Sequence, residues 1–386
     1  MSLRVAMLTY SVRPRGGVVH ALEVAEALAR RGHDVRLFAI APPGQGFFRA
    51  PPVPAVVVEH VPPDTGFDER IAAQIAAYAE GLRDELRDGG YDVVHAQDCI
   101  SANAALALRD AGVIARVLRT VHHVDDFRSP SLIACQRRSI VAPDGVLCVS
   151  PPWLRRVREE FGVRCDLVAN GVDARRFRPA RDAAERAAAR RAAGVEDRLA
   201  VLTVGGVEPR KGSLTLLRAF AVARAALPGR RPVLLLAGGA TLFDYRDEIA
   251  RFDELREELG LDGDVRVLGP VGDGELEDLY RAADVFAFPS VKEGYGLALL
   301  EALSAGVPAV VSDLDVFRSF LADGESALMA PVGDGVALGE AIVRVAGDPE
   351  LADRLRDGGR RVAAEHGWDR VAEAHERAYA RFLAGA

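Results

Sequence analysis

Short apolar runs alternate along most of the chain with longer stretches that have the periodicity of amphipathic helices. The short runs are apolar at nearly every position, which is typical of parallel strands buried on both faces. The predicted strands cover residues 5–10, 34–40, 55–61, 91–96, 115–121, 145–150, 165–169, 199–204, 232–238, 265–269, 285–290 and 308–313. The clearest helices between them are predicted at residues 18–32, 102–112, 182–193, 213–227, 244–259, 275–283 and 296–304. This alternation predicts parallel sheets with helices on both faces.

The pattern is interrupted once, at residues 169–182, by an Asn-Gly turn, a proline and several arginines. A second, similar alternation then begins, so we predict two doubly wound α/β domains of the Rossmann-like kind that face one another. Residues 1–175, joined by a C-terminal helix at 369–386, form the first, and residues 176–368 form the second. Because ligands bind beyond the carboxyl ends of such strands, we expect the site in the cleft between the domains. No G-x-G-x-x-G follows either first strand, which argues against a nicotinamide oxidoreductase.

Composition supports a folded, two-domain protein. A chain of 386 residues exceeds the size at which a single core usually keeps growing. Hydrophobic residues make up 49% and charged residues 27%, and no run approaches the roughly 18 apolar residues of a membrane span. The apolar start of the chain is too short for a signal peptide. We therefore expect a cytoplasmic protein with no transmembrane segment, and peripheral contact with a membrane stays open.

Charge and cysteine usage exclude further classes. The formal net charge of −7 argues against nucleic acid as a partner. Four cysteines without C-x-x-C spacing suggest neither a zinc site nor a disulfide framework, so free thiols are expected. Only two of the 49 basic residues are lysines, Lys211 and Lys292. A lysine kept against such an arginine bias suggests a need for a compact point charge, although chance also explains two residues.

Polar residues that follow predicted strands are the candidate site. Gly16 and Gly17 precede a helix, where backbone amides and the helix dipole favour an anion, although a plain tight turn is the alternative. Arg210 and Lys211 also lead into a helix. Two cations at a helix N-terminus are unfavourable with respect to the dipole, and a bound diphosphate would resolve the conflict.

Two further groups follow strands. His122 and His123 precede Asp125 and Asp126, but adjacent side chains on an extended chain point apart, so a single histidine facing the cleft is more economical than a metal site. The stretch at residues 293–306 carries Glu293 and Glu301 in otherwise apolar surroundings. Buried carboxylates need partners, and this spacing suits two separate hydroxyl-rich groups better than the paired acids of a glycosidase. Gly294 and Gly296 between them would offer amides to phosphate.

Four motifs together resemble the retaining glycosyltransferases of family 4. They are PRGG-x2-H, NGVD-x3-F-x-P, EPRKG and FPSVKEGYGLALLEALSAGVP, and the last contains an E-x7-E arrangement. The resemblance covers nearly the whole chain and implies the GT-B architecture, two facing Rossmann-like domains with the donor in the cleft. It further implies a metal-independent transfer from a UDP-, GDP- or ADP-sugar to an acceptor hydroxyl with retention of configuration, without a cofactor. It also implies a closing helix that returns to the first domain, and we predict domain closure on donor binding.

Individual roles follow from the same resemblance. The catalytic set would be His122, Arg210, Lys211 and Glu293, with the two cations on the diphosphate, Glu293 on the sugar hydroxyls and His122 beside the sugar. Glu301 would accept hydrogen bonds from the ribose, and backbone near Val271 would read the base. The donor-binding set is Gly16, Gly17, Gly206, Val271, Gly294, Tyr295, Gly296, Leu297 and Glu301.

Several points stay open at the sequence level. Asp313 and Asp315 form a D-x-D spacing where many family members have Gly-Gly-x-x-Glu, so the pocket on that side is undefined. A sugar-nucleotide epimerase or a phosphorylase shares the two-domain architecture, and a non-catalytic sugar-binding protein is a further alternative. The donor base, the sugar, the acceptor and the oligomeric state are not determined by these residues.

Overall fold

The chain folds into two compact units. The computed structural model describes residues 2–239 and 245–385. Unit 1 comprises Met1–Gly171 and Trp368–Ala386, and unit 2 comprises Val172–Gly367. The chain therefore passes from one unit to the other twice, and the C-terminal helix belongs to unit 1.

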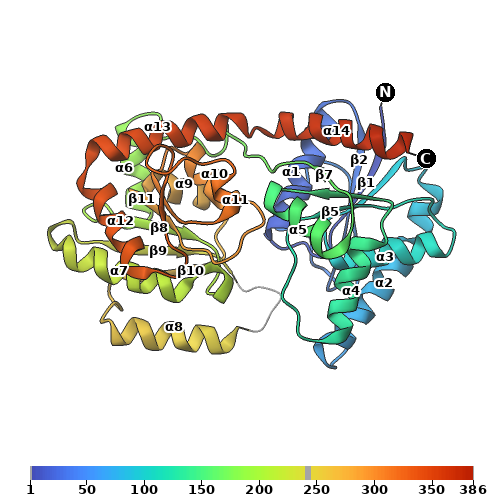
Figure 1. Ribbon diagram of the computed structural model, residues 1–386, viewed down its shortest axis with the longest axis horizontal. Helices are drawn as coiled ribbons and strands as arrows, with labels where there is room; N and C mark the ends of the chain where they lie inside the picture. Colours follow the sequence, from blue (N-terminus) through green and yellow to red (C-terminus); the bar gives the residue numbers. More distant parts are fainter. Residues whose placement is uncertain (1, 240–244, 386) are drawn as a thin grey trace. The chain divides into compact units, whose positions relative to one another are not determined.

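Unit 1 is built on a seven-stranded, all-parallel sheet with the strand order β3-β2-β1-β4-β5-β6-β7. The strands are β1 (Arg4–Leu8), β2 (Asp34–Ala41), β3 (Ala55–Glu59), β4 (Val93–Ala96), β5 (Leu118–Val121), β6 (Gly145–Cys148) and β7 (Asp166–Leu167). The helices are α1 (Gly16–Arg30), α2 (Phe67–Asp88), α3 (Cys99–Asp110), α4 (Pro130–Val141), α5 (Pro151–Phe161) and α14 (Trp368–Ala384). Helices lie on both faces of the sheet (Figure 1).

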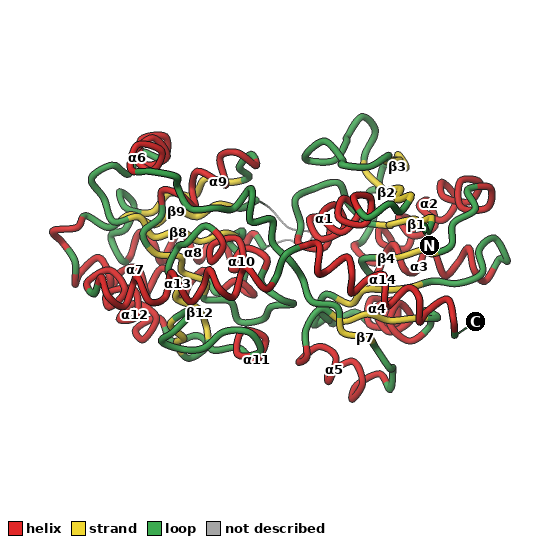
Figure 2. The backbone as a smooth tube through the Cα atoms, turned by 90° about the horizontal axis from the view of Figure 1, so that it is seen from above, coloured by secondary structure: helices red, strands yellow, loops and turns green. Residues whose placement is uncertain are grey.

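Unit 2 repeats the plan with six parallel strands in the order β10-β9-β8-β11-β12-β13. The strands are β8 (Ala200–Val204), β9 (Val233–Ala237), β10 (Val265–Gly269), β11 (Val285–Phe288), β12 (Ala309–Ser312) and β13 (Leu328–Ala330). The helices are α6 (Ala183–Ala192), η1 (Pro209–Lys211), α7 (Ser213–Ala226), η2 (Pro228–Arg230), α8 (Arg246–Glu258), α9 (Asp273–Ala282), α10 (Leu297–Ser304), α11 (Asp315–Arg318), α12 (Gly335–Gly347) and α13 (Pro349–Glu365). In Figure 2, α7 and α12 lie side by side, where Gly335 and Gly339 let the two helices approach closely.

Burial explains why the central strands read as continuous apolar runs. All five residues of β9 are buried, as are the four residues of β11. Helices pack on both faces of each sheet, so neither face of a central strand meets water. The strand order reverses next to β1 in unit 1 and next to β8 in unit 2. The loops beyond β1, β4, β8 and β11 are therefore at the topological switch points, where open α/β sheets bind ligands.

The predicted fold class, two doubly wound parallel-sheet domains, is confirmed. Each predicted strand overlaps an observed one, whereas β13, α2, α4 and the short helix α11, which begins at Asp315, were not predicted. The helix predicted from residue 244 is observed as α8, and residue 244 itself lies outside the described residues. The edge strand β13 has only three residues, too few to show the hydrophobic pattern of a strand.

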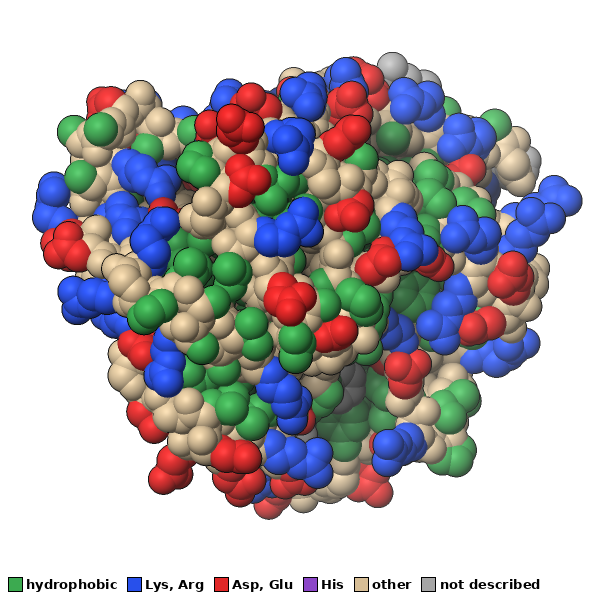
Figure 3. Space-filling view, turned by 60° about the vertical axis from the view of Figure 1, so that its left-hand side comes forward, with side chains coloured by type: hydrophobic (Ala, Val, Ile, Leu, Met, Phe, Trp, Pro, Cys, Tyr) green, Lys and Arg blue, Asp and Glu red, His purple; other side chains and the backbone are tan. Residues whose placement is uncertain are grey.

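The surface agrees with the modest negative charge. On the face shown in Figure 3, basic and acidic side chains are interspersed rather than gathered into a patch of one sign. Within the described residues, no helix is both long and apolar enough to cross a membrane.

Candidate functional site

The loop beyond β8 carries the two predicted cations. It runs through Glu208 into the short helix η1, whose last residues are Arg210 and Lys211, and α7 begins directly after Gly212. Gly212 has a φ of 67°, and a Cβ there would lie 2.1 Å from the carbonyl oxygen of Pro289. Only glycine fits such a left-handed position so close to backbone, so the β8 loop can rest against the β11 loop only with glycine at this point.

The loop beyond β11 brings an acid to these cations. Glu293, 9% exposed, accepts three hydrogen bonds on Oε1: from Lys211 Nζ at 2.7 Å, from Arg210 Nη1 at 3.1 Å and from Ser290 Oγ at 2.9 Å. Arg210 also lies 3.6 Å from the Glu208 carboxylate and donates to the carbonyl oxygen of Lys292 at 3.3 Å. We call Arg210, Lys211 and Glu293 the charged cluster.

Burial and pairing set the ionisation of the charged cluster. Burial alone would raise the pKa of Glu293, but the positive charges of Lys211 and Arg210 outweigh it and lower this pKa to about 2. Burial lowers the pKa of Lys211, and Glu293 opposes that shift. The Lys211 ammonium also lies 4.7 Å from the centroid of the Phe288 ring, a cation–π distance. The acid is thus held ionised beside two cations in a largely dry site.

Glu301, the second acid, lies on α10 and is held by a tyrosine from α9. The Tyr280 hydroxyl lies 2.8 Å from Glu301 Oε2 and 3.0 Å from the carbonyl oxygen of Ala298. Tyr280 is 1% exposed, and burial followed by the negative charge of Glu301 raises its pKa well above the usual value. The hydroxyl therefore stays protonated and orients the Glu301 carboxylate.

The other predicted donor-binding residues of unit 2 lie beyond β8, β10 and β11. Gly294, Tyr295 and Gly296 lie between β11 and α10, and Leu297 is the first residue of α10. Gly296 has a φ of 104°, and Tyr295 stacks on Phe320 with ring centroids 5.0 Å apart. The remaining two residues are Gly206, where a Cβ would lie 2.5 Å from the carbonyl oxygen of Gly239, and Val271, half-buried between β10 and α9.

In unit 1 the structure brings two predicted residues together. A Cβ on Gly17, in the first turn of α1, would lie 3.5 Å from Cδ2 of His122, which follows β5. The Nε2 atom of His122 lies 3.1 Å from Oε1 of Gln97, which follows β4. Gly16 is exposed, and a Cβ there would meet nothing within 4 Å.

Behind His122 lies a group of buried histidines that the sequence analysis did not single out. His20 lies with its ring centroid 4.8 Å from that of His122 and 5.7 Å from that of His375 on α14. His95 lies 5.8 Å from His375 by the same measure, and its ring nitrogens are 2.7 Å from Thr120 Oγ1 and 2.9 Å from the Tyr379 hydroxyl. We call His20, His95, His122 and His375 the histidine cluster.

The histidine cluster is uncharged at neutral pH. Burial, reinforced by the neighbouring histidines, lowers the pKa of His20 to about 3 and that of His122 well below its usual value. Burial lowers the pKa of His375 to about 4. His122 can therefore present a neutral imidazole to a ligand.

Side chains of the His123–Asp126 group and of the D-x-D group are engaged in ion pairs. His123 Nε2 lies 3.2 Å from Asp125 Oδ1, and Arg318 donates to both carboxylate oxygens of Asp313. Across residues 2–239 and 245–385, no group of three or more His, Cys, Asp or Glu side chains is placed to hold a metal ion.

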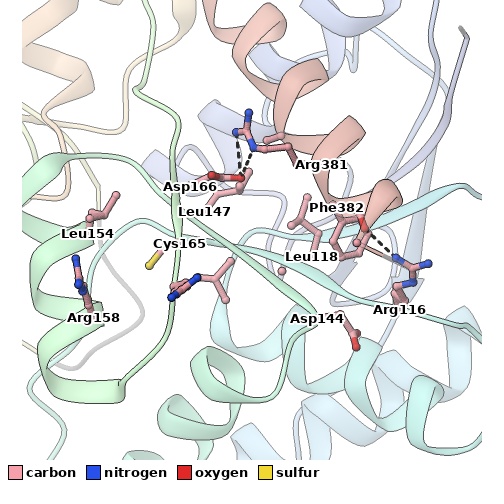
Figure 4. A pocket seen from close by; sticks show the side chains of 15 residues that line it. Arg116, Leu118, Asp144, Leu147, Leu154, Arg158, Cys165, Asp166, Arg381 and Phe382 are labelled. Atoms are coloured by element: carbon pink, nitrogen blue, oxygen red, sulfur yellow. Dashed lines mark hydrogen bonds and ion pairs between the residues drawn. The ribbon is translucent and has the colours of Figure 1, made fainter.

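A separate cavity of about 790 Å³ lies in unit 1 beside α14 (Figure 4). Leu118, Leu147, Leu154 and Phe382 form apolar walls, and Arg381 at its edge is paired with Asp166 at 3.0 Å. Its lining shares no residue with the predicted site.

Sequence reasoning missed several partners of the predicted residues. Ser290, Glu208 and Tyr280 in unit 2 and Gln97 and His20 in unit 1 all contact predicted residues or their neighbours. A signal was present for His20, which is the histidine of PRGG-x2-H, and for Ser290, which lies three residues before Glu293. The separation of Tyr280 and Glu301 in the sequence gives no indication that the two side chains are in contact.

Comparison with known proteins decides the family. The sequence profile "Glycosyltransferase Family 4" matches residues 14–176, and "Glycosyl transferases group 1" matches residues 185–362. A D-inositol 3-phosphate glycosyltransferase of Saccharomonospora viridis is 32% identical, with 96% of this chain and 92% of the relative covered. The chain is a family 4 glycosyltransferase. Another D-inositol 3-phosphate glycosyltransferase, of Actinosynnema mirum, is 31% identical over 97% of this chain and 96% of its own.

Solved structures place the glycosyltransferase in the GT-B fold. Sucrose-phosphate synthase from Thermosynechococcus elongatus superposes with a TM-score of 0.84 at 23% identity, covering 100% of both chains. Anabaena HepE, solved with UDP and glucose, superposes with a TM-score of 0.80 at 18% identity, covering 97% of this chain and 98% of that one. The recognition of a family 4 glycosyltransferase from its four motifs is therefore confirmed.

Proposed function

We propose that this glycosyltransferase moves a sugar from a nucleoside-diphosphate sugar to an acceptor hydroxyl, with retention of configuration and without a metal ion. The observation that carries the proposal is the charged cluster. Two partly buried cations and one buried, ionised acid lie together at the switch point of a parallel sheet, and both cations precede a helix N-terminus. That placement of cations is unfavourable for the fold alone and favourable for a bound diphosphate.

The charged cluster would act on the leaving group. Departure of a nucleoside diphosphate places negative charge on the β-phosphate, and fixed cations in a dry site stabilise that charge more in the transition state than in the ground state. Glu293 accepts hydrogen bonds from both cations and so holds their side chains in position. In this proposal Glu293 also accepts hydrogen bonds from the sugar hydroxyls.

Other residues would orient the donor. Glu301, positioned by Tyr280, suits the ribose hydroxyls, because an ionised carboxylate accepts two hydrogen bonds from a vicinal diol. Neutral His122, close to Gly17, suits the transferred sugar, because a neutral imidazole both donates and accepts. No side chain is assigned as a covalent nucleophile, and retention in this proposal results from attack on the same face that the diphosphate leaves.

We further propose a small phosphorylated polyol as the acceptor. The support is the name of the relatives at 31–32% identity, D-inositol 3-phosphate glycosyltransferase, together with exposed Arg13 and half-buried Arg15 in the loop before α1. Two guanidinium groups on one loop suit a phosphate.

A release assay tests the proposal. UDP-, GDP- and ADP-sugars are each mixed with inositol phosphate, free inositol or no acceptor, in the presence of EDTA, and released nucleotide and product anomer are measured. We expect one donor to be consumed only with the phosphorylated acceptor, with the product anomer matching the donor. Complete loss of transfer on chelation would contradict metal independence. Dependence on inorganic phosphate would favour a phosphorylase, and conversion of the sugar nucleotide into an isomer without an acceptor would favour an epimerase.

A further inference from the structure

The cysteines of unit 1 lie in pairs rather than singly. All four cysteines of the sequence belong to unit 1 and are free thiols. Cys99 is the first residue of α3 and Cys135 lies in α4, 36 positions later, yet their sulfur atoms are only 3.3 Å apart. Both side chains are half-buried, so a small reagent can reach them.

A buried amide holds this pair together. Asn103, 3% exposed, donates from Nδ2 to the carbonyl oxygens of Cys99 at 2.9 Å and Cys135 at 3.0 Å, and the same atom lies 3.3 Å from the Cys135 sulfur. Its Oδ1 accepts from Arg138 at 2.9 Å. One side chain from α3 thus fixes the approach of α4 at the two thiols.

The two thiols are chemically unequal. The hydrogen bond from Cys99, helped by the positive charge of Arg138, lowers the pKa of the Cys135 thiol. The same hydrogen bond and burial raise the pKa of Cys99. Because the thiolate is the nucleophile, Cys135 is the sulfur that reacts first.

We propose that Cys99 and Cys135 are a reversible dithiol–disulfide couple whose oxidant is hydrogen peroxide. The Cys135 thiolate attacks one peroxide oxygen, an S–O bond forms, the O–O bond breaks, and the leaving hydroxide takes up a proton to give water and a sulfenic acid. Cys99 then attacks that sulfur as it loses its proton, so the S–S bond forms and the S–O bond breaks with release of a second water. Two thiols are oxidised and one peroxide is reduced. The sulfurs need to close by only about 1.2 Å to reach the bond length of roughly 2.05 Å.

The couple lies directly beneath two site loops. Gln136, next to Cys135, accepts from the Asp125 amide at 2.7 Å and donates to the Asp125 carbonyl oxygen at 3.0 Å, so α4 holds the segment that follows His122. Asp98, next to Cys99, accepts from the Tyr10 amide at 2.8 Å, so α3 holds the segment that leads to Gly16. A covalent link between α3 and α4 would therefore restrain the segment at residues 122–129.

Peptide mapping tests the couple on the full-length protein. The reduced protein is treated with a small excess of peroxide, free thiols are alkylated, and tryptic peptides are identified. We expect free thiols to fall from four to two, a linked pair of peptides 88–109 and 129–137, and full recovery of thiols with dithiothreitol.

In Cys99→Ser, a near-isosteric change, Cys135 should instead be trapped as sulfenic acid by dimedone. In the matched control Cys165→Ser, the Cys99–Cys135 link should still form.

Clear outcomes would overturn the proposal. Four free thiols after peroxide, or a link confined to Cys148 and Cys165, would exclude the couple. Amide exchange reports on the restraint: we expect several-fold slower exchange in residues 122–129 of the oxidised wild type and no change in oxidised Cys135→Ser. Equal exchange in both, with the disulfide shown by mapping, would mean that oxidation does not restrain the loop.

Discussion

The two units share one topology, but the residues at their switch points differ in charge. In unit 1 the residues behind His122 are histidines that burial keeps neutral. In unit 2 the corresponding loops hold an ionised glutamate against two cations. The same Rossmann-like frame thus supports a neutral, buried histidine cluster in one unit and a charged cluster in the other.

In the proposed function, this difference divides recognition between the two units. Neutral imidazoles and backbone amides suit sugar hydroxyls, which carry no charge, whereas a cationic pair suits the diphosphate that accumulates charge as the bond breaks. The fold supplies only the position of the loops, and the residues placed there decide the chemistry.

The largest effect is expected from removing one cation. Lys211→Ala should lower turnover by about 10²–10³-fold, the cost typical of losing one transition-state hydrogen-bond donor. Lys211→Arg should restore little, because a planar fork does not match a compact ammonium. The matched control is Arg230→Ala, which removes one positive charge in η2, before β9, and should leave turnover unchanged. Steady-state kinetics with the identified donor measure all three; equal loss in the control would refute a local role.

Acidification should separate the two units by stability. The pKa values of His20 and His375 are lowered in the folded state, so below pH 6.5 the unfolded chain binds more protons than folded unit 1. Unit 1 therefore loses stability as pH falls from 6.5 to about 4 for His375 and to about 3 for His20. His375 alone accounts for about 3 kcal/mol over that range. The pKa of Glu293 is lowered too, but its contribution is lost only as pH falls from 4.5 to about 2. Amide exchange against pH should show unit 1 opening first, with a shallower pH dependence in His375→Gln; unit 2 opening first would contradict this reading.

Two glycines at the starts of equivalent helices should respond differently to alanine. Gly212→Ala forces a side chain into a left-handed conformation and against the Pro289 carbonyl, so it should destabilise unit 2 by about 1–3 kcal/mol. Gly16→Ala in unit 1 meets open space and should change the free energy of unfolding by less than about 0.5 kcal/mol. Denaturant melts of both variants compare them directly. Similar losses would show that the β8 loop is not packed as described.

The smallest effect is expected at the tyrosine that positions Glu301. Tyr280→Phe keeps the ring in the core and removes only the hydroxyl that bonds to Glu301. The carboxylate loses its orientation, so KM for the donor should rise about tenfold, the equivalent of roughly 1.4 kcal/mol, with kcat nearly unchanged. A fall in kcat with an unchanged KM would place Tyr280 in the chemical step instead. Tyr78→Phe, a buried tyrosine of unit 1, is the control and should leave KM unchanged.

Much of the fold could be predicted because buried parallel strands appear in the sequence as continuous apolar runs. Runs such as Val233–Ala237 are apolar throughout and bounded by turn residues, so their number and type follow from the sequence. The helix α4 was missed because Pro130–Val141 buries only Leu132, Ser139 and Ile140 and leaves Ile133 and Val141 exposed, so its apolar residues do not mark one face. Such a helix has little amphipathic signal.

The candidate site could be predicted only in part because its contacts join distant segments. Lys211 and Glu293 were each identified, but nothing in the sequence states that the ammonium lies 2.7 Å from the carboxylate. The histidine cluster is harder still, since it unites α1, β4, the β5 loop and α14. Which residues of these sets bind the donor stays a prediction.

The central claim is that a diphosphate binds the charged cluster without a metal ion. Calorimetric titration of UDP, GDP and ADP into the wild type and Lys211→Ala, with EDTA throughout, tests it most directly. We predict that one nucleotide binds the wild type in chelator and that Lys211→Ala binds it at least tenfold more weakly. Equal affinity for both proteins, or binding that needs a divalent cation, would contradict the account.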